Sequence, residues 1–160
     1  SFALHYQRGP AREMARAAEL EAELERACRY TQALLPAPIT EGPVRAEWCF
    51  QPSARIGGDA LGYRFLDSGR FAAFMIDVAG HGVGSALLAA SVMNTLRERA
   101  GPDPAAVLAS LNASFQMDEQ GGQFFTMWYG VADLGARRLD FACAGHHPGF
   151  LLHRGASAPE

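Results

Sequence analysis

The pattern of apolar and polar positions divides the chain into helical and extended segments. Residues 10–35 are mostly strong helix formers, and small or apolar residues recur there at alternating spacings of three and four. This spacing predicts a helix with one mildly apolar face. The face is short and rich in alanine for a coiled coil, so two interpretations stay open: a helix that covers its own domain, or a dimerising linker that follows another domain.

Period-two alternation predicts the strands. Residues 44–51 alternate apolar and polar side chains, which is typical of a half-buried strand. Residues 60–78 form two apolar arms around a turn at 67–70, and residues 124–146 form two more around a turn at 134–137. We therefore expect two hairpins, followed by a last short strand over residues 149–154.

Two helices are expected between the hairpins. Residues 85–100 are too densely apolar for a surface helix, so we predict a mostly buried helix capped near Gly84 or Ser85. Asp103 as N-cap and Pro104 at the first helical position begin the next one. Its inward positions are Val107, Leu108, Leu111 and Phe115. A helix, a hairpin, two helices and a hairpin indicate an α+β domain with an antiparallel sheet and helices packed outside.

Composition narrows the class of protein. With 160 residues, 49% of them hydrophobic, the chain suits one soluble domain. It has no apolar run long enough to span a membrane and no targeting segment at its start. Three scattered cysteines without a CxxC pair favour a reducing cytoplasm. A net charge of −3 with evenly scattered arginines argues against a nucleic-acid partner.

Two aspartates stand out because glycines accompany them. Asp59 follows a glycine pair in "ARIGGDALG", and Asp77 ends an apolar run before the Gly-His-Gly turn in "MIDVAGHG". Glycine lets the backbone approach a ligand, and a carboxylate at a strand tip can point into a cleft. Hard cations prefer such oxygen ligands. Each motif alone is more often a turn that caps its own backbone, and His81 alone is more often an ordinary loop histidine.

The motifs taken in order are more specific. They run along residues 34–152 as "LLP", "QPSARIGGD", "DVAGHGVGSALL", "LN", "FFTMWYGV" and "AGHHP". Together they resemble the bacterial SpoIIE/RsbU branch of the metal-dependent (2C-type, PPM) serine/threonine protein phosphatases. The resemblance implies an antiparallel β-sandwich flanked by helices, with a two-metal centre at one end of the sandwich.

The resemblance also assigns roles to residues. Asp59 and Asp77 would be metal ligands, with Asp77 bridging two Mn2+ or Mg2+ ions, and Val78 would offer its backbone carbonyl. Two ions about 3.5–4 Å apart would activate a water for attack on phosphorus. His81 is a candidate general acid for the leaving seryl oxygen. Arg55 is a candidate phosphate contact, although a loop arginine is more often simply solvated.

The expected substrate and partners follow from the same resemblance. Family members typically dephosphorylate serine or threonine on a STAS-domain anti-sigma-factor antagonist. Their phosphatase domains commonly follow a receiver, PAS or GAF sensor through a helical linker that dimerises. Residues 1–33 would then be the linker, which allows a homodimer, and residues 34–160 the phosphatase-like domain.

The chain departs from the family pattern in two places. Ala60 and Gly62 stand where many members have an aromatic residue and a second acid. The family's downstream Asp-Gly segment, which carries a further metal ligand, and its C-terminal strands have no counterpart here. Two acids rarely hold a pair of Mg2+ ions. Either the chain is truncated, or residues are left out of the sequence, or catalysis has been lost. The alternative to an enzyme is a catalytically silent, phosphatase-like binding module.

The "AGHHP" motif carries two adjacent histidines, His146 and His147. On an extended backbone they would face opposite ways, so they would not easily bind one ion. We interpret the motif as a structural turn before the last strand. The preceding aromatic run predicts core and surface cover, with Thr126 facing the side that carries the site.

Overall fold

The structure is a computed structural model that describes residues 2–51 and 55–152. Its elements, in chain order, are α1 (Phe2–Ala33), β1 (Ala60–Phe65), β2 (Arg70–Val78), α2 (Val83–Arg99), α3 (Pro104–Ser114), the 3-10 turn η1 (Met117–Gln120), β3 (Phe125–Asp133) and β4 (Arg138–Ala144). No helix in this described part of the chain is both long and apolar enough to cross a membrane.

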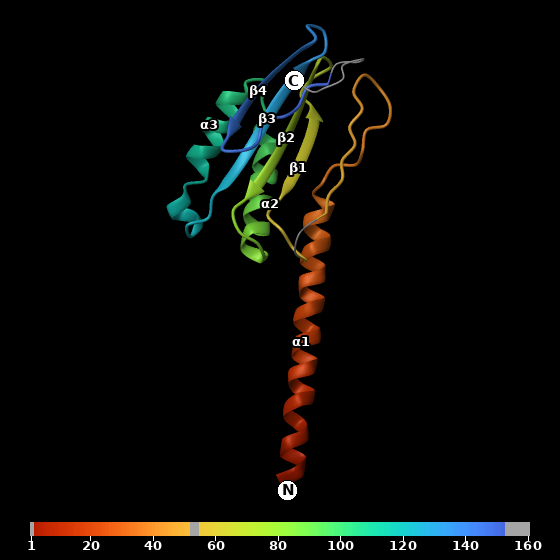
Figure 1. Ribbon diagram of the computed structural model, residues 1–160, viewed down its shortest axis with the longest axis vertical. Coiled ribbons are helices and arrows are strands. Elements are labelled where there is room, and N and C mark those ends of the chain that lie inside the picture. Colours follow the sequence, from red (N-terminus) through yellow and green to blue (C-terminus); the bar gives the residue numbers. More distant parts are fainter. Residues whose placement is uncertain (1, 52–54, 153–160) are drawn as a thin grey trace.

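The four strands form one antiparallel sheet in the order β1-β2-β3-β4 (Figure 1). Both predicted hairpins are confirmed, with their turns where the sequence indicated them. In the first turn the Asp67 carboxylate accepts hydrogen bonds from the backbone N–H groups of Gly69 and Arg70, at 2.9 and 2.8 Å. In the second, Asp133 accepts from the N–H of Ala136 at 2.8 Å. An aspartate that caps its own turn fixes the register of the strands on either side.

Helices α2 and α3 pack on the same face of the sheet, and the core lies between them and β2 and β3 (Figure 1). Along β2 the buried residues alternate with more exposed ones, as period two requires. The core-facing residues of β2 and β3 are Ala72, Phe74, Ile76, Val78, Met127, Tyr129 and Val131. The α+β class with an antiparallel sheet is therefore confirmed. We call the opposite side of the sheet the open face.

The helix boundaries match the sequence signals to different degrees. As predicted, Asp103 caps α3 by accepting from the N–H of Ala106 at 3.1 Å, and Pro104 follows it. Helix α2 begins slightly earlier than expected, and its N-cap is Gly82 with no side-chain cap. The prediction of a cap at Gly84 or Ser85 is wrong because Ser85 is fully buried and contacts a backbone carbonyl before the helix, that of Ala79.

Two predicted strands are not formed. Residues 44–51 make only one isolated bridge, between Ala46 and Ile39, and residues 149–152 are irregular. The rest of the last predicted strand lies outside the described residues. An alternating pattern becomes a strand only where a neighbouring strand offers hydrogen-bond partners. Within the described residues there is thus one sheet, and the second layer of the sandwich implied by the family resemblance is not built.

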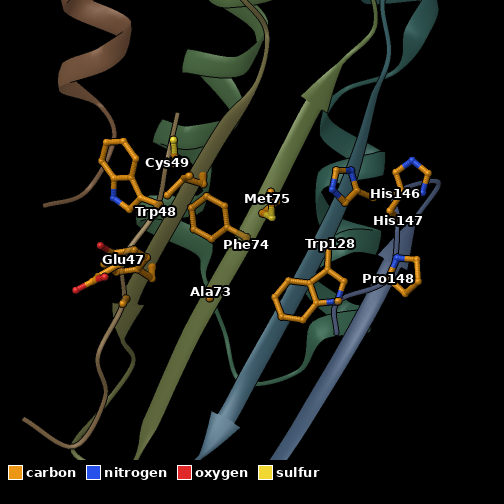
Figure 2. Close-up of a pocket in the computed structure, with 15 residues that line it drawn as sticks. Glu47, Trp48, Cys49, Ala73, Phe74, Met75, Trp128, His146, His147 and Pro148 are labelled. Atoms are coloured by element: carbon orange, nitrogen blue, oxygen red, sulfur yellow. The ribbon is translucent and has the colours of Figure 1, made fainter. Parts of the chain in front are cut away.

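Both segments instead border a cavity of about 650 Å3 on the open face. Its floor is made by β1, β2 and β3, and Figure 2 shows Trp48 and Trp128 on either side of Phe74 and Met75. Trp48 is fixed there by a hydrogen bond from its indole N–H to the Pro36 carbonyl, at 2.9 Å. The open face is therefore apolar along most of its length.

Helix α1 starts earlier than predicted and projects away from the sheet as one long rod (Figure 1). Its described side chains are exposed up to Glu23, and partial burial begins at Leu24. The first residue to join the core is Leu34, just after the helix. The division into a linker over residues 1–33 and a domain over residues 34–160 stays a prediction.

Because α2 supplies much of the core, we expect Leu96→Ala to destabilise the fold strongly. Leu96 is fully buried, and a large-to-small change there should cost about 2–5 kcal/mol in the free energy of unfolding. Leu87→Ala on the same helix is the matched control, since Leu87 is 64% exposed. Urea denaturation of both variants tests this, and equal midpoints would contradict the described core.

Candidate metal centre

The strand register brings Asp59 and Asp77 together at one end of the open face. Ala60 at the start of β1 pairs with Ile76 of β2, so the preceding Asp59 comes opposite Asp77. The two carboxyl groups are close enough for one to hydrogen-bond the other when protonated. On the next strand, Thr126 is the direct partner of Asp77. Three polar residues thus stand side by side at the end of three adjacent strands.

A close backbone approach holds the two acidic loops together. A Cβ on Gly58 would lie 2.6 Å from the Val78 Cβ and 2.9 Å from the Ser85 Cβ, distances that real side chains do not reach. The N–H of Gly82 also donates to the Ile56 carbonyl at 3.3 Å. Gly58 is therefore required for close contact, which explains why a glycine precedes Asp59.

Buried Ser85 ties a third loop to this arrangement. Its hydroxyl donates to the Ala79 carbonyl at 3.4 Å and accepts from the Gln123 side-chain amide at 3.2 Å. The Ala79 N–H donates to the Phe124 carbonyl at 2.9 Å. The backbone that follows Asp77 is thus fixed on two sides, which orients that carboxylate relative to the sheet.

Among the described residues, the ion pairs of arginine involve neither Asp59 nor Asp77. Partial burial raises the pKa of the Asp59 carboxyl above its ordinary value of 3.8, and the neighbouring Asp77 carboxylate raises it further by repulsion and hydrogen bonding. The positive charge of a protonated His146 acts in the opposite direction and lowers this pKa. Two carboxylates that repel each other are stabilised by a shared cation.

The other residues singled out in the sequence differ in their burial and contacts. The Val78 side chain is buried, and its carbonyl faces Gly58, next to Asp59. His81 is exposed between Gly80 and Gly82, both of which have positive φ. Arg55 forms an ion pair with Glu21 of α1 at 2.5 Å, and its carbonyl accepts the Cys28 thiol at 2.8 Å. Arg55 therefore contacts the helix rather than standing free.

Sequence reasoning missed His146 as a neighbour of the acids. Its Nδ1 lies 2.9 Å from the Thr126 hydroxyl, on the strand next to Asp77. The motif was interpreted as a structural turn, and Gly145 does turn the chain, with φ of 67°. The orientation of Thr126 toward the site is consistent with the expectation. The signal that points to His146 is the β3–β4 register, which pairs Trp128 with Cys143 and so carries the next turn back over Thr126.

The donor set suits a hard divalent cation. Two carboxylates and an adjacent backbone carbonyl are oxygen ligands of the kind that Mg2+ and Mn2+ prefer. No group of three or more His, Cys, Asp or Glu side chains in the described part of the chain could hold a metal ion together. The acid pair therefore fits a cation that keeps several of its waters, and further protein ligands would have to come from elsewhere.

The repulsion between the acids gives a pH-dependent stability. The pKa of Asp59 is 3.8 in the unfolded chain and higher in the folded one, so between these two values the folded state binds more protons than the unfolded state. The stability of the metal-free chain therefore falls as the pH rises through this range, and the loss is complete above the folded-state pKa. We expect Asp59→Asn to raise the metal-free Tm at pH 7 by about 2–4 °C, since screening keeps the gain to about 1 kcal/mol or less. The gain should disappear near pH 3.5. A variant that is less stable than the wild type at pH 7 without metal would contradict the acid pair.

The close approach at Gly58 allows a test of the candidate metal centre with a single methyl group. Gly58→Ala must push the Asp59 loop away from Val78, so we expect the affinity for Mn2+ to fall about 10- to 100-fold. Gly69→Ala is the control, because a Cβ there meets nothing nearer than an Asp67 oxygen at 3.8 Å. Isothermal titration calorimetry with Mn2+ measures both. Unchanged affinity in Gly58→Ala would show that the two loops need not touch.

Part of the chain is similar to a known protein family. The family "Stage II sporulation protein E (SpoIIE)" matches residues 67–160, more than half of the chain. "Phosphoserine phosphatase RsbP" of Bacillus subtilis (strain 168) is 31% identical over 132 residues, and the match covers 79% of this chain and 33% of that protein. The chain thus spans about a third of the length of this curated relative.

A solved structure supports the fold. The "SiaA-PP2C domain of Pseudomonas aeruginosa" superposes with a TM-score of 0.63 at 22% identity, over 81% of this chain and 55% of that one. At this level of identity the likeness concerns the fold alone. The family match over residues 67–160 and the identity to RsbP lead to one assignment. The chain belongs to the SpoIIE/RsbU-type branch of the metal-dependent (2C-type, PPM) serine/threonine protein phosphatases.

Proposed function

We propose that this domain hydrolyses phosphoserine or phosphothreonine on a regulatory protein, using Mn2+ or Mg2+ held by Asp59 and Asp77. The observation that carries the proposal is the meeting of these two carboxyl groups at the end of β1 and β2. They come from two separate sequence motifs. None of the described contacts requires two like charges at this place. Bound cations would supply Lewis-acid activation of a water and would neutralise the phosphoryl oxygens.

The chain's own residues would position the reacting groups. Asp77 is fixed by β2 and by the Ala79 backbone bond that follows it, and Asp59 by the packing of Gly58. The Val78 carbonyl faces Gly58, the residue before Asp59, and would add a third oxygen. His81, on the exposed turn after Asp77, is available to protonate the leaving seryl oxygen. Arg55 would reach a phosphate only after leaving Glu21.

The substrate class is proposed from the relatives. RsbP is named a phosphoserine phosphatase, which supports a phosphoserine substrate for this chain. We propose a phosphorylated STAS-domain anti-sigma-factor antagonist as the partner, as the family resemblance implies. The open rim of the site, with exposed carboxylates at a sheet end, suits a side chain presented by a folded protein.

Helix α1 is proposed as a regulatory linker from an upstream sensor or receiver domain, able to form a homodimer. Its described side chains before Leu24 contact little of the domain. Its last turns touch the loop that carries Asp59, through Glu21–Arg55 and through the Cys28 thiol. A rotation of α1 would therefore pull directly on one of the two metal-binding loops.

The decisive experiment is hydrolysis of p-nitrophenyl phosphate and of a phosphoserine STAS protein, with and without Mn2+. We expect Mn2+-dependent turnover that Asp77→Asn lowers by about 10²–10³-fold or more. The reason is that the Asp77 carboxylate would hold the cation whose positive charge stabilises the transition state. Asp118→Asn is the control, since Asp118 is exposed on η1. The same assays on a version extended at its C-terminus test whether a further ligand is needed.

A second candidate function is a binding module that captures a partner without turnover. It is favoured by the finding that only two acids converge within the described residues. If neither the chain nor its extended version hydrolyses either substrate, yet the STAS protein still binds, this second function holds and the enzyme does not.

A further inference from the structure

His146 is held in a defined orientation by a contact to one of its two ring nitrogens. Its Nδ1 is 2.9 Å from the Thr126 hydroxyl, and both residues are partly buried. Gly145, which bridges to Met127, turns the backbone so that this contact forms. Both imidazoles of the motif stand at one end of the cavity in Figure 2, with ring centroids 6.2 Å apart. Nδ1 is engaged by Thr126, so among the described contacts Nε2 is the ring nitrogen left for a ligand.

The position of His146 continues the row of polar residues across the sheet. Asp59 precedes β1, Asp77 is on β2 and Thr126 is its partner on β3, while His146 follows β4. Its charge is felt at Asp59. Asp59 and Asp77, at the other end of the row, repel a phosphate dianion. A phosphoryl group that binds beside these acids therefore needs a hydrogen-bond donor at the opposite end of the row. His146 is the partly exposed imidazole that the row places there.

We propose that His146, oriented by Thr126, contacts the phosphoryl group of the substrate through Nε2. The inference rests on the proposed phosphatase function and adds a substrate-binding residue to it. When the Thr126 hydroxyl donates to Nδ1, Nε2 carries the proton and donates to a phosphoryl oxygen. In an imidazolium both ring nitrogens carry protons, so Nε2 again donates to the phosphoryl oxygen. His146 is then a substrate contact, and Thr126 is a positioning residue that acts through it.

Two substitutions at one position separate the two ring nitrogens. The amide of His146→Asn reaches the place of Nδ1 and keeps the Thr126 contact, while that of His146→Gln reaches the place of Nε2. The dissociation constant of inorganic phosphate for the Mn2+-loaded chain is measured by 31P NMR line broadening. We expect it to rise about 10- to 100-fold in His146→Asn, as for a lost hydrogen bond to a charged group, and about threefold or less in His146→Gln.

His147→Asn is the matched control, since His147 is exposed beside it, and its phosphate affinity should equal that of the wild type. Mn2+ affinity and the thermal midpoint should stay unchanged in His146→Asn, His146→Gln and His147→Asn. If His146 had only a structural role, its substitutions would lower the thermal midpoint. Thr126→Val should weaken phosphate binding less than His146→Asn does. Added to His146→Ala, it should have no further effect on phosphate binding.

Wild-type phosphate affinity in His146→Asn would overturn the proposal, as would a parallel loss of Mn2+ affinity. If the wild-type chain hydrolyses phosphoserine while His146→Asn binds phosphate and turns over normally, the contact fails and the phosphatase function stands. If the wild-type chain neither binds phosphate with Mn2+ nor hydrolyses any substrate, both proposals fall together.

Discussion

The hydrogen-bond register of β1, β2 and β3 is the constraint on which the rest of the site depends. If β1 were shifted by one residue relative to β2, Asp59 and Asp77 would lie on opposite faces of the sheet, because side chains alternate along a strand. Asp67 fixes this register from the turn, through its bonds to the backbone of Gly69 and Arg70. A turn remote from the site therefore sets the separation of the two carboxylates.

The two faces of the sheet have different tasks. On the helix side, residues of α2 and α3 bury Phe74, Ile76, Met127 and Tyr129, and this packing supplies the free energy that offsets the repulsion of two adjacent acids. On the open face, the same strands carry Asp77 and Thr126 at one end and apolar side chains further along. Stability and chemistry are thus built on alternate residues of the same strands.

The loop before β1 is where the fold, the site and the long helix meet. Gly58 packs against Val78, Ile56 bonds to Gly82, and Arg55 joins Glu21 of α1. The loop is consequently held from two sides, by the second acidic motif and by helix α1. A change in α1 has a short physical path to Asp59, through one exposed ion pair and one thiol contact.

Local signals were enough to specify the elements whose partners are close in sequence. Both hairpins and the Asp103 cap of α3 follow from turn and cap chemistry within a few residues, so the sequence alone predicted them. The motif order predicted the family, which is confirmed. It also pointed to Asp59 and Asp77, which the strand register places opposite each other, and their role as metal ligands stays a prediction. The extended pattern over residues 44–51 was misleading, because a strand also needs a neighbour with free hydrogen-bond partners. The contact between Thr126 and His146 was decided only by tertiary structure, since it depends on how β3 and β4 pair and on the turn at Gly145, which no local pattern encodes.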